Sequence, residues 1–193
     1  MRTLLYTFMF LAAALPLMGN ENIDKLSEGN KRFIKGDIVR QALVASQHPF
    51  CAVVACSDSR VAPEVIFDQG LGELFVVRLA GNVASPEALD SLDFACNVLN
   101  VDLIVVLGHE NCGAVQAVME HSADKELGAL GKLIEPAVKN ASSVEEAIIA
   151  NVKEQMKIIK NDPDLQKNIQ AGSLSVVGAV YHFDTGLVTF LQQ

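Results

Sequence analysis

Two short stretches of the chain carry side chains of the types that bind metals. The first is Cys56-Ser57-Asp58-Ser59-Arg60, and the second runs from His109 to Cys112. Together they offer two thiolates, one imidazole and one carboxylate, a donor set that suits Zn²⁺ better than other common ions. The sequence therefore predicts a zinc site, with Cys56, His109, Cys112 and Asp58 as candidate donors.

Both stretches directly follow short apolar runs, at residues 50–55 and 103–107. Apolar runs of this length are typical of buried strands. In an open parallel sheet, the carboxyl ends of neighbouring strands frame the crevice in which ligands bind. We therefore expect the two pairs of donors to meet at one edge of a sheet and to close on a single metal ion.

Asp58 and Arg60 are residues that a purely structural zinc site does not need. In an extended or turn segment, residues two apart point the same way, so Cys56, Asp58 and Arg60 can share one side of their loop. Arg60 can then keep Asp58 ionised through a bidentate contact. The pair favours a catalytic site over a non-catalytic zinc or redox module, in which Cys56 and Cys112 would form a disulfide.

The motifs closely resemble those of the β-class carbonic anhydrases. The resemblance covers about residues 22 to 193. The matching segments are 56–61, 72–78, 80–82, 107–115 and 176–181, followed by a turn at 184–186. Leu79 is a departure, because many relatives carry Asn there, and it changes the polarity beside the expected pocket without touching the candidate metal ligands.

This resemblance implies a role for each residue of the site. Cys56, His109 and Cys112 correspond to zinc ligands, and Asp58 with Arg60 corresponds to the catalytic dyad. Substrate contacts are implied for four further residues, namely Gln47, Phe75, Ala80 and Gly113. The resemblance also implies a closed state, in which Asp58 turns onto the metal. In that state Asp58 would be a fourth zinc ligand and would switch the site off.

The implied reaction is the reversible hydration of carbon dioxide to bicarbonate by a zinc-bound hydroxide, oriented by the Asp/Arg dyad. Zinc with three protein ligands keeps a fourth position for water and lowers the pKa of that water. A hydroxide held beside an apolar pocket can attack a small electrophile such as CO₂. An alternative is a zinc-dependent hydrolase of CS₂ or COS on the same scaffold, because only the admitted electrophile would differ.

Composition and charge narrow the possible partners. The chain has 193 residues, of which half are apolar and only 6 are Pro, so residues 20–193 can form one domain with a sizeable core. The net charge is −8 and no cluster of Lys or Arg is present, which argues against nucleic acid or an anionic membrane as a partner. The family resemblance implies a homodimer or a higher homo-oligomer.

The first 19 residues differ in kind from the rest. Met1-Arg2 brings a positive charge, residues 4–15 are almost continuously apolar, and Gly19 precedes a polar segment. This pattern predicts a secretory signal peptide, cleaved near Gly19, and therefore a periplasmic or secreted protein. The apolar run is short for a membrane span, although an uncleaved anchor or an arm packed on a partner subunit stays open. Export also leaves a Cys51–Cys96 disulfide open.

Helix and strand signals alternate along the remaining chain. Strands are expected at 50–55, 74–79 and 103–107, and a hairpin at 174–181 and 187–191. Helices are expected at 23–35, after Ser85-Pro86, from Cys112, after the capping-box pattern that begins at Ser143, and from Asp162-Pro163. The sequence therefore predicts an α/β fold, with a mostly parallel central sheet flanked by helices and an antiparallel C-terminal edge hairpin.

Overall fold

The computed structural model describes residues 21–36, 43–120 and 127–192. The chain divides into two compact units, residues 1–44 and residues 45–193. The predicted signal peptide, residues 1–19, lies outside the described residues. In the described ranges, every helix is too short or too polar to cross a membrane.

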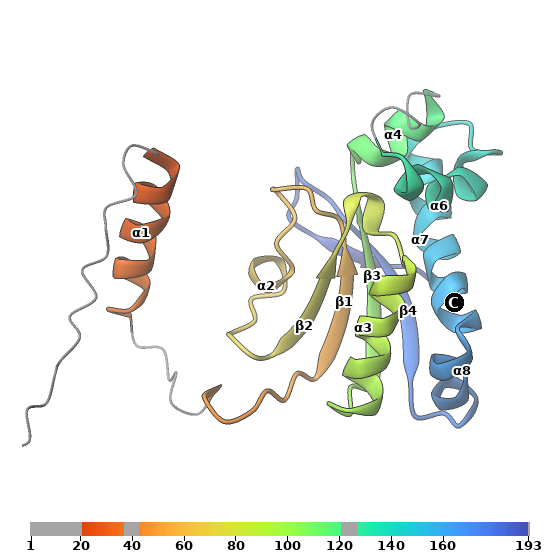
Figure 1. The fold of residues 1–193 in the computed structure, drawn as a ribbon. Helices are drawn as coiled ribbons and strands as arrows, with labels where there is room; N and C mark the ends of the chain where they lie inside the picture. The colour runs from red at the N-terminus through yellow and green to blue at the C-terminus, as the bar shows by residue number, and fades with distance from the viewer. Residues whose placement is uncertain (1–20, 37–42, 121–126, 193) are drawn as a thin grey trace, which may run out of the picture. The chain divides into compact units, whose positions relative to one another are not determined.

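The first unit contains helix α1 (Glu21–Phe33), drawn in red-orange in Figure 1. Its bounds agree closely with the helix expected at 23–35. Lys31 and Arg32 lie in its last turn, where positive charge interacts favourably with the helix dipole.

The second unit is built on a five-stranded sheet with the strand order β2-β1-β3-β4-β5. Its strands are β1 (Cys51–Ala55), β2 (Leu74–Arg78), β3 (Leu103–His109), β4 (Ser175–Tyr181) and β5 (Val188–Phe190). The first four pair in parallel, and β5 pairs antiparallel with β4. The predicted α/β fold with an antiparallel C-terminal edge is confirmed.

The two central strands, β1 and β3, are continuous apolar segments because both faces of the sheet are covered at this point. All five residues of β1 are buried, and so are six of the seven residues of β3. Ala55 at the end of β1 is paired with Leu107 of β3. The strand order reverses between these neighbours, so the crevice at their carboxyl ends is the expected ligand site of such a sheet.

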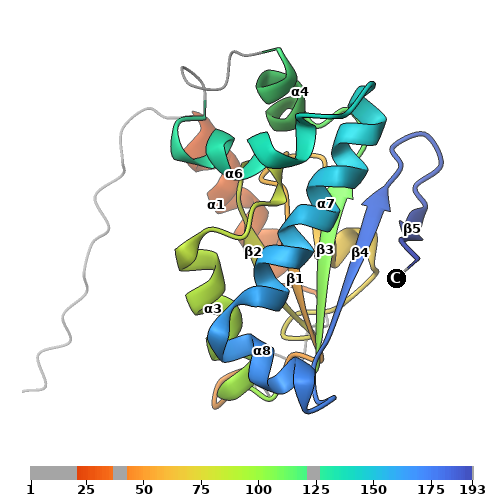
Figure 2. The same ribbon diagram turned by 90° about the vertical axis from the view of Figure 1, so that its right-hand side faces the viewer.

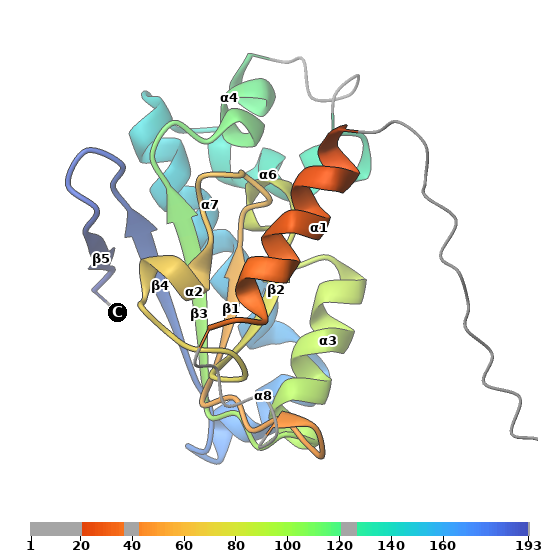
Figure 3. The ribbon, with the colours of Figure 1, turned by 90° about the vertical axis from the view of Figure 1, so that its left-hand side faces the viewer.

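Helices cover the two faces of this sheet unequally. Helices α3 (Pro86–Asn97), α7 (Val144–Asn161) and α8 (Pro163–Gln170) lie on the face turned to the viewer in Figure 2. The short helix α2 (Pro63–Ile66) lies on the opposite face, which Figure 3 shows. Helices α4 (Gly113–Met119) and α6 (Ala129–Val138) lie near the carboxyl ends of the strands. The sequence pattern did not predict α2 or α6.

Side-chain caps begin three of these helices as expected. The Ser85 hydroxyl accepts a hydrogen bond from the Ala88 N–H, and the Ser143 hydroxyl accepts one from the Glu146 N–H. The Asp162 carboxylate caps α8 in the same way. The capping box at Ser143 is incomplete, because the Glu146 carboxylate binds the N–H and hydroxyl of Ser142 instead of the Ser143 N–H.

Two apolar clusters, one on each side of the sheet, form the core. The larger cluster contains Cys96 and the buried faces of α3, α4 and α7, and the smaller one contains Cys51 and residues beside α2. All four cysteines are free thiols. Cys51 and Cys96 lie in different clusters, so the disulfide that the sequence left open is not formed, and burial raises the pKa of each thiol to about 11.

Candidate active site

Three metal-binding side chains meet at the carboxyl ends of β1 and β3. Cys56 directly follows β1, His109 is the last residue of β3, and Cys112 is the N-cap of α4. All three residues are buried, and their ligand atoms lie within 4.8 Å of one another. Strand β3 runs two residues past the expected end at Leu107, so the imidazole belongs to the rigid sheet and not to a loop.

The imidazole of His109 is prepared to bind a metal through one nitrogen. Its Nδ1 lies 2.8 Å from the Glu110 carbonyl oxygen. Because a carbonyl only accepts hydrogen bonds, Nδ1 carries the hydrogen and donates a hydrogen bond to that carbonyl. The other nitrogen, Nε2, is buried and has no hydrogen-bond partner among the described residues. A buried acceptor without a partner is costly, and a metal ion held with the two sulfur atoms would satisfy it. The residues therefore fit zinc.

The two thiols of the site differ in acidity. A hydrogen bond with the Cys112 thiol lowers the pKa of Cys56, and the contacts with His109 and the Gly81 N–H lower it further. The Gly81 nitrogen lies 3.3 Å from the Cys56 sulfur. The same hydrogen bond to Cys56, together with burial, raises the pKa of Cys112. One thiolate is thus favoured before metal arrives, and the second thiol has to lose its proton on binding.

Asp58 forms an ion pair with Arg60 and lies beside His109. Arg60 donates from Nε to Asp58 Oδ1 at 3.0 Å and from Nη2 to Oδ2 at 2.7 Å, and its backbone N–H donates to Oδ1 at 2.9 Å. These hydrogen bonds hold the pKa of Asp58 well below its usual range. The Oδ2 atom also lies 4.0 Å from His109 Nε2, so the carboxylate is close to the metal position without occupying it.

The four residues expected to contact substrate are not all brought to this centre. Ala80 and Gly113 are next to Gly81 and Cys112, whereas Phe75 pairs with Ala52 early in β1 and Gln47 precedes that strand. Phe75 is a half-buried residue of β2, with its ring centroid 6.5 Å from that of Phe94. Ala80 begins the 3-10 turn Ala80–Asn82 and is half-buried, and Gly113 begins α4 and is exposed. Gln47 is exposed in the loop before β1. Their roles toward substrate stay predictions.

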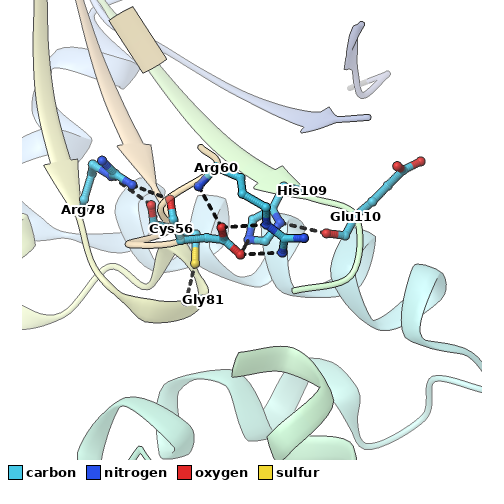
Figure 4. A network of polar contacts seen from close by, with 7 residues as sticks. Cys56, Arg60, Arg78, Gly81, His109 and Glu110 are labelled. Carbon is cyan, nitrogen blue, oxygen red and sulfur yellow. Dashed lines mark hydrogen bonds and ion pairs between the residues drawn. The ribbon is translucent and has the colours of Figure 1, made fainter. Parts of the chain in front are cut away.

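Arg78 ends the matching segment 72–78, but the sequence motifs gave it no role in the site. It is the last residue of β2, and it donates from Nε to the Cys56 carbonyl at 3.0 Å and from Nη2 to the Asp58 carbonyl at 2.6 Å. Figure 4 shows it on the side of the Cys56 loop away from His109. Arg78 therefore fixes the backbone of the loop that carries both Cys56 and Asp58. The sequence signal for this role was an Arg at the end of an apolar strand.

Two buried amides of α7 hold the turn that contacts the Cys56 sulfur. Asn151 donates to the Gly81 carbonyl at 2.8 Å, and Gln155 accepts from the Ala84 N–H at 2.9 Å. Gly81 has a φ of 72°, and a Cβ there would lie 2.5 Å from Ile134 Cδ1, so glycine suits this position. The signal was visible in the sequence, since both amides fall within the apolar stripe of α7.

Comparison with known proteins shows the family to which this chain belongs. The sequence profile of the carbonic anhydrase family matches residues 51–188, which include all three metal-binding residues and the Asp58–Arg60 pair. The chain belongs to the β-carbonic anhydrase family. Zinc is the metal that this family uses, and Cys56, His109 and Cys112 are arranged as a group that could hold it.

Individual relatives support the same assignment along most of the chain. Carbonic anhydrase 2 of Mycobacterium tuberculosis is 41% identical over 83% of this chain and 87% of its own length. A carbonic anhydrase of Mycolicibacterium smegmatis is 36% identical, over 84% and 88%. Among solved structures, the β-carbonic anhydrase CcaA superposes with a TM-score of 0.78 at 25% identity, covering 90% of this chain and 93% of that one.

Proposed function

We propose that this protein catalyses the reversible hydration of carbon dioxide to bicarbonate, with Asp58 and Arg60 orienting the nucleophile. The observation that carries the proposal is the buried triad of Cys56, His109 and Cys112 with the Asp58 carboxylate 4.0 Å from the free His109 nitrogen. A structural zinc site does not need an acid and a guanidinium at this position. Membership of the β-carbonic anhydrase family supports the choice of substrate.

The residues around the metal position have different roles in the proposed reaction. When bound, zinc supplies a Lewis acid that lowers the pKa of a water molecule, so that hydroxide is available near neutral pH. Asp58 accepts a hydrogen bond from that nucleophile and thereby aims the lone pair of the nucleophile at the carbon of CO₂. Arg60 keeps Asp58 ionised and in one rotamer, because it binds both carboxylate oxygens. Gln47, Phe75, Ala80 and Gly113 are proposed to contact the substrate.

A carbon dioxide hydration assay on the zinc-loaded protein tests this function. Hydration is expected with zinc, and its loss is expected after removal of the metal by a chelator. Rates measured in parallel with CS₂ and COS discriminate the alternative hydrolases on the same scaffold. A zinc-loaded protein that hydrates no CO₂ would refute the proposal.

Hydration is expected to rise from neutral to alkaline pH and to fade reversibly below neutrality while zinc stays bound. Two thiolates neutralise the charge of the dication, so water at the fourth position is less acidic than at a three-histidine centre. Arg60 holds the pKa of Asp58 well below its usual range, so the carboxylate stays ionised across this interval. The loss on acidification therefore follows protonation of the nucleophile, together with capture of the metal by ionised Asp58.

Stopped-flow hydration across this pH range, with metal content measured at both ends, checks the pH prediction. The same activity from mildly acidic to alkaline pH would mean that neither ionisation of the water nor capture by Asp58 limits the rate. In that case the mechanism proposed for Asp58 has to be replaced.

We further propose that the mature protein is exported, on the basis of the charged start and apolar run in residues 1–19. Mass spectrometry of the protein from its native host is expected to find a chain that begins near Asn20. Intact Met1 on protein from the cytosolic fraction would contradict both the predicted signal peptide and the predicted periplasmic or secreted location.

A homo-oligomer is the proposed assembly, with a dimer as its smallest form. β-Carbonic anhydrases of the ascomycete Sordaria macrospora, which share this fold at a TM-score of 0.72, are described as tetrameric. Light scattering on the purified protein measures its mass in solution directly. A mass of one chain across the micromolar range would contradict the proposal.

A further inference from the structure

Phe183, two residues after the end of β4, touches two different parts of the site. Its ring centroid lies 5.4 Å from the His109 ring at an interplanar angle of 62°, an edge-to-face contact. The guanidinium carbon of Arg60 lies over the same ring, 4.2 Å from its centroid. One aromatic ring therefore contacts both a metal-binding imidazole and the guanidinium that binds Asp58.

Arg60 needs support beyond its contact with Asp58. The Arg60 side chain is 55% exposed, whereas the Asp58 side chain is only 17% exposed. An exposed ion pair contributes little to holding a long side chain in one rotamer, because water screens the charges and the ordered side chain loses entropy. The face of an aromatic ring attracts a guanidinium and restricts its plane. Phe183 thus favours the rotamer in which Arg60 reaches both oxygens of Asp58.

The Glu110 carboxylate holds Phe183 in this place. Glu110 Oε2 accepts from the Phe183 N–H at 3.0 Å, and Oε1 lies 2.7 Å from His182 Nδ1. His182 Nε2 in turn lies 3.1 Å from Thr189 Oγ1 on β5. Figure 4 shows the Glu110 side chain pointing away from Cys56 and Arg60. The residue next to a zinc ligand thereby ties the start of the C-terminal turn to the site.

We propose that Phe183 is a positioning residue for the hydration reaction, and that Glu110 acts through it. The ring keeps Arg60 in the orientation that holds Asp58 away from the metal position. This inference rests on the proposed orienting role of Asp58 and Arg60. Without the ring, Arg60 samples more rotamers, and Asp58, whose Oδ2 is 4.0 Å from His109 Nε2, turns more often toward the metal position.

The test compares Phe183→Leu with Phe183→Tyr in the zinc-loaded protein. The leucine keeps apolar bulk without a ring face, and its kcat/KM for CO₂ is expected to fall about three- to tenfold with zinc content unchanged. The tyrosine keeps the ring face and is expected to retain the wild-type rate. Phe190→Leu, on exposed β5, is the matched control and is expected to leave the rate unchanged. Phe183→Met replaces the leucine variant if that protein does not fold.

A spectroscopic measurement tests the stacking independently of activity. The Nε–Hε NMR signal of Arg60, assigned by its loss in Arg60→Lys, is expected to be shifted by the ring current of Phe183. The shift should disappear in Phe183→Leu and persist in Phe183→Tyr and Phe190→Leu. An Arg60 signal that does not move in Phe183→Leu overturns the inference.

The kinetic outcomes separate this inference from the proposed function. A wild-type rate in Phe183→Leu with full zinc, or an equal loss in the tyrosine variant, overturns the role of Phe183 alone. A zinc-loaded wild-type protein without hydration activity refutes the proposed function, and it also refutes the role of Phe183 in that reaction. The NMR signal of Arg60 still reports in that case whether the ring and the guanidinium are stacked.

Discussion

Replacing Cys56 by Ser or His109 by Ala is expected to remove zinc and hydration activity together. The wild-type protein is expected to carry about one zinc per chain, since three protein ligands and one open position are the usual form of a catalytic zinc site. A serine hydroxyl is a much poorer zinc ligand than a thiolate, and alanine leaves no donor at the end of β3. Zinc content measured by elemental analysis, with the hydration rate of the same samples, checks both losses.

Cys51→Ala is the matched control for the ligand variants. Cys51 is a buried free thiol on the same strand that delivers Cys56, but it lies in the smaller core cluster beside α2. Its replacement is expected to cost some stability while zinc content stays at the wild-type level. Full zinc occupancy in both Cys56→Ser and His109→Ala would disprove the proposed ligands, whatever the activity of the two proteins.

Asp58→Asn is expected to retain zinc and to lose about a hundredfold in hydration rate, the cost of a misoriented reacting group. An amide can donate a hydrogen bond to the nucleophile where a carboxylate only accepts, so the lone pair is no longer aimed at CO₂. Arg60→Ala is expected to cause a similar loss, because the Asp58 carboxylate loses both side-chain hydrogen bonds that hold it. Stopped-flow hydration at matched zinc content measures both effects.

Asp90→Asn makes the same carboxylate-to-amide change at an exposed position of α3 and is expected to leave the rate unchanged. Arg60→Lys is a sharper variant than Arg60→Ala, because it keeps the positive charge but cannot bind both carboxylate oxygens at once. A near-normal rate in Asp58→Asn or in Arg60→Ala would contradict the orienting role of the pair.

Much of the fold could be predicted because strong local signals agree with one another. The apolar runs that became β1 and β3 are covered on both faces, so they carry no polar interruption and were visible as strands. Ser85 and Asp162 cap their helices through contacts two or three residues away, which makes these helix starts readable from sequence. Helix α6 was missed, since Pro136 inside it argues against a helix and Gly128 precedes it without a side-chain cap.

The sequence by itself determined the chemistry of this protein: which donors are present, and that they follow two apolar strands. Cys56 and Asp58 lie two residues apart, and His109 and Cys112 three apart, so their relations are set by local backbone geometry. The tertiary structure decided how these groups are held. Arg78 reaches the Cys56 carbonyl across 22 positions, Asn151 reaches Gly81 across 70, and Glu110 reaches the turn after β4 across 73.

The sequence does not name the partners in such contacts, because they depend on the register of the sheet and on the packing of α7 against it. A single Glu or Phe has the same local signature whether it is placed by a turn or holds a catalytic side chain. Phe183 reaches Arg60 because the parallel pairing of β3 with β4 places His109 opposite Tyr181. The physical reason is that strand pairing, not chain proximity, sets which side chains can touch.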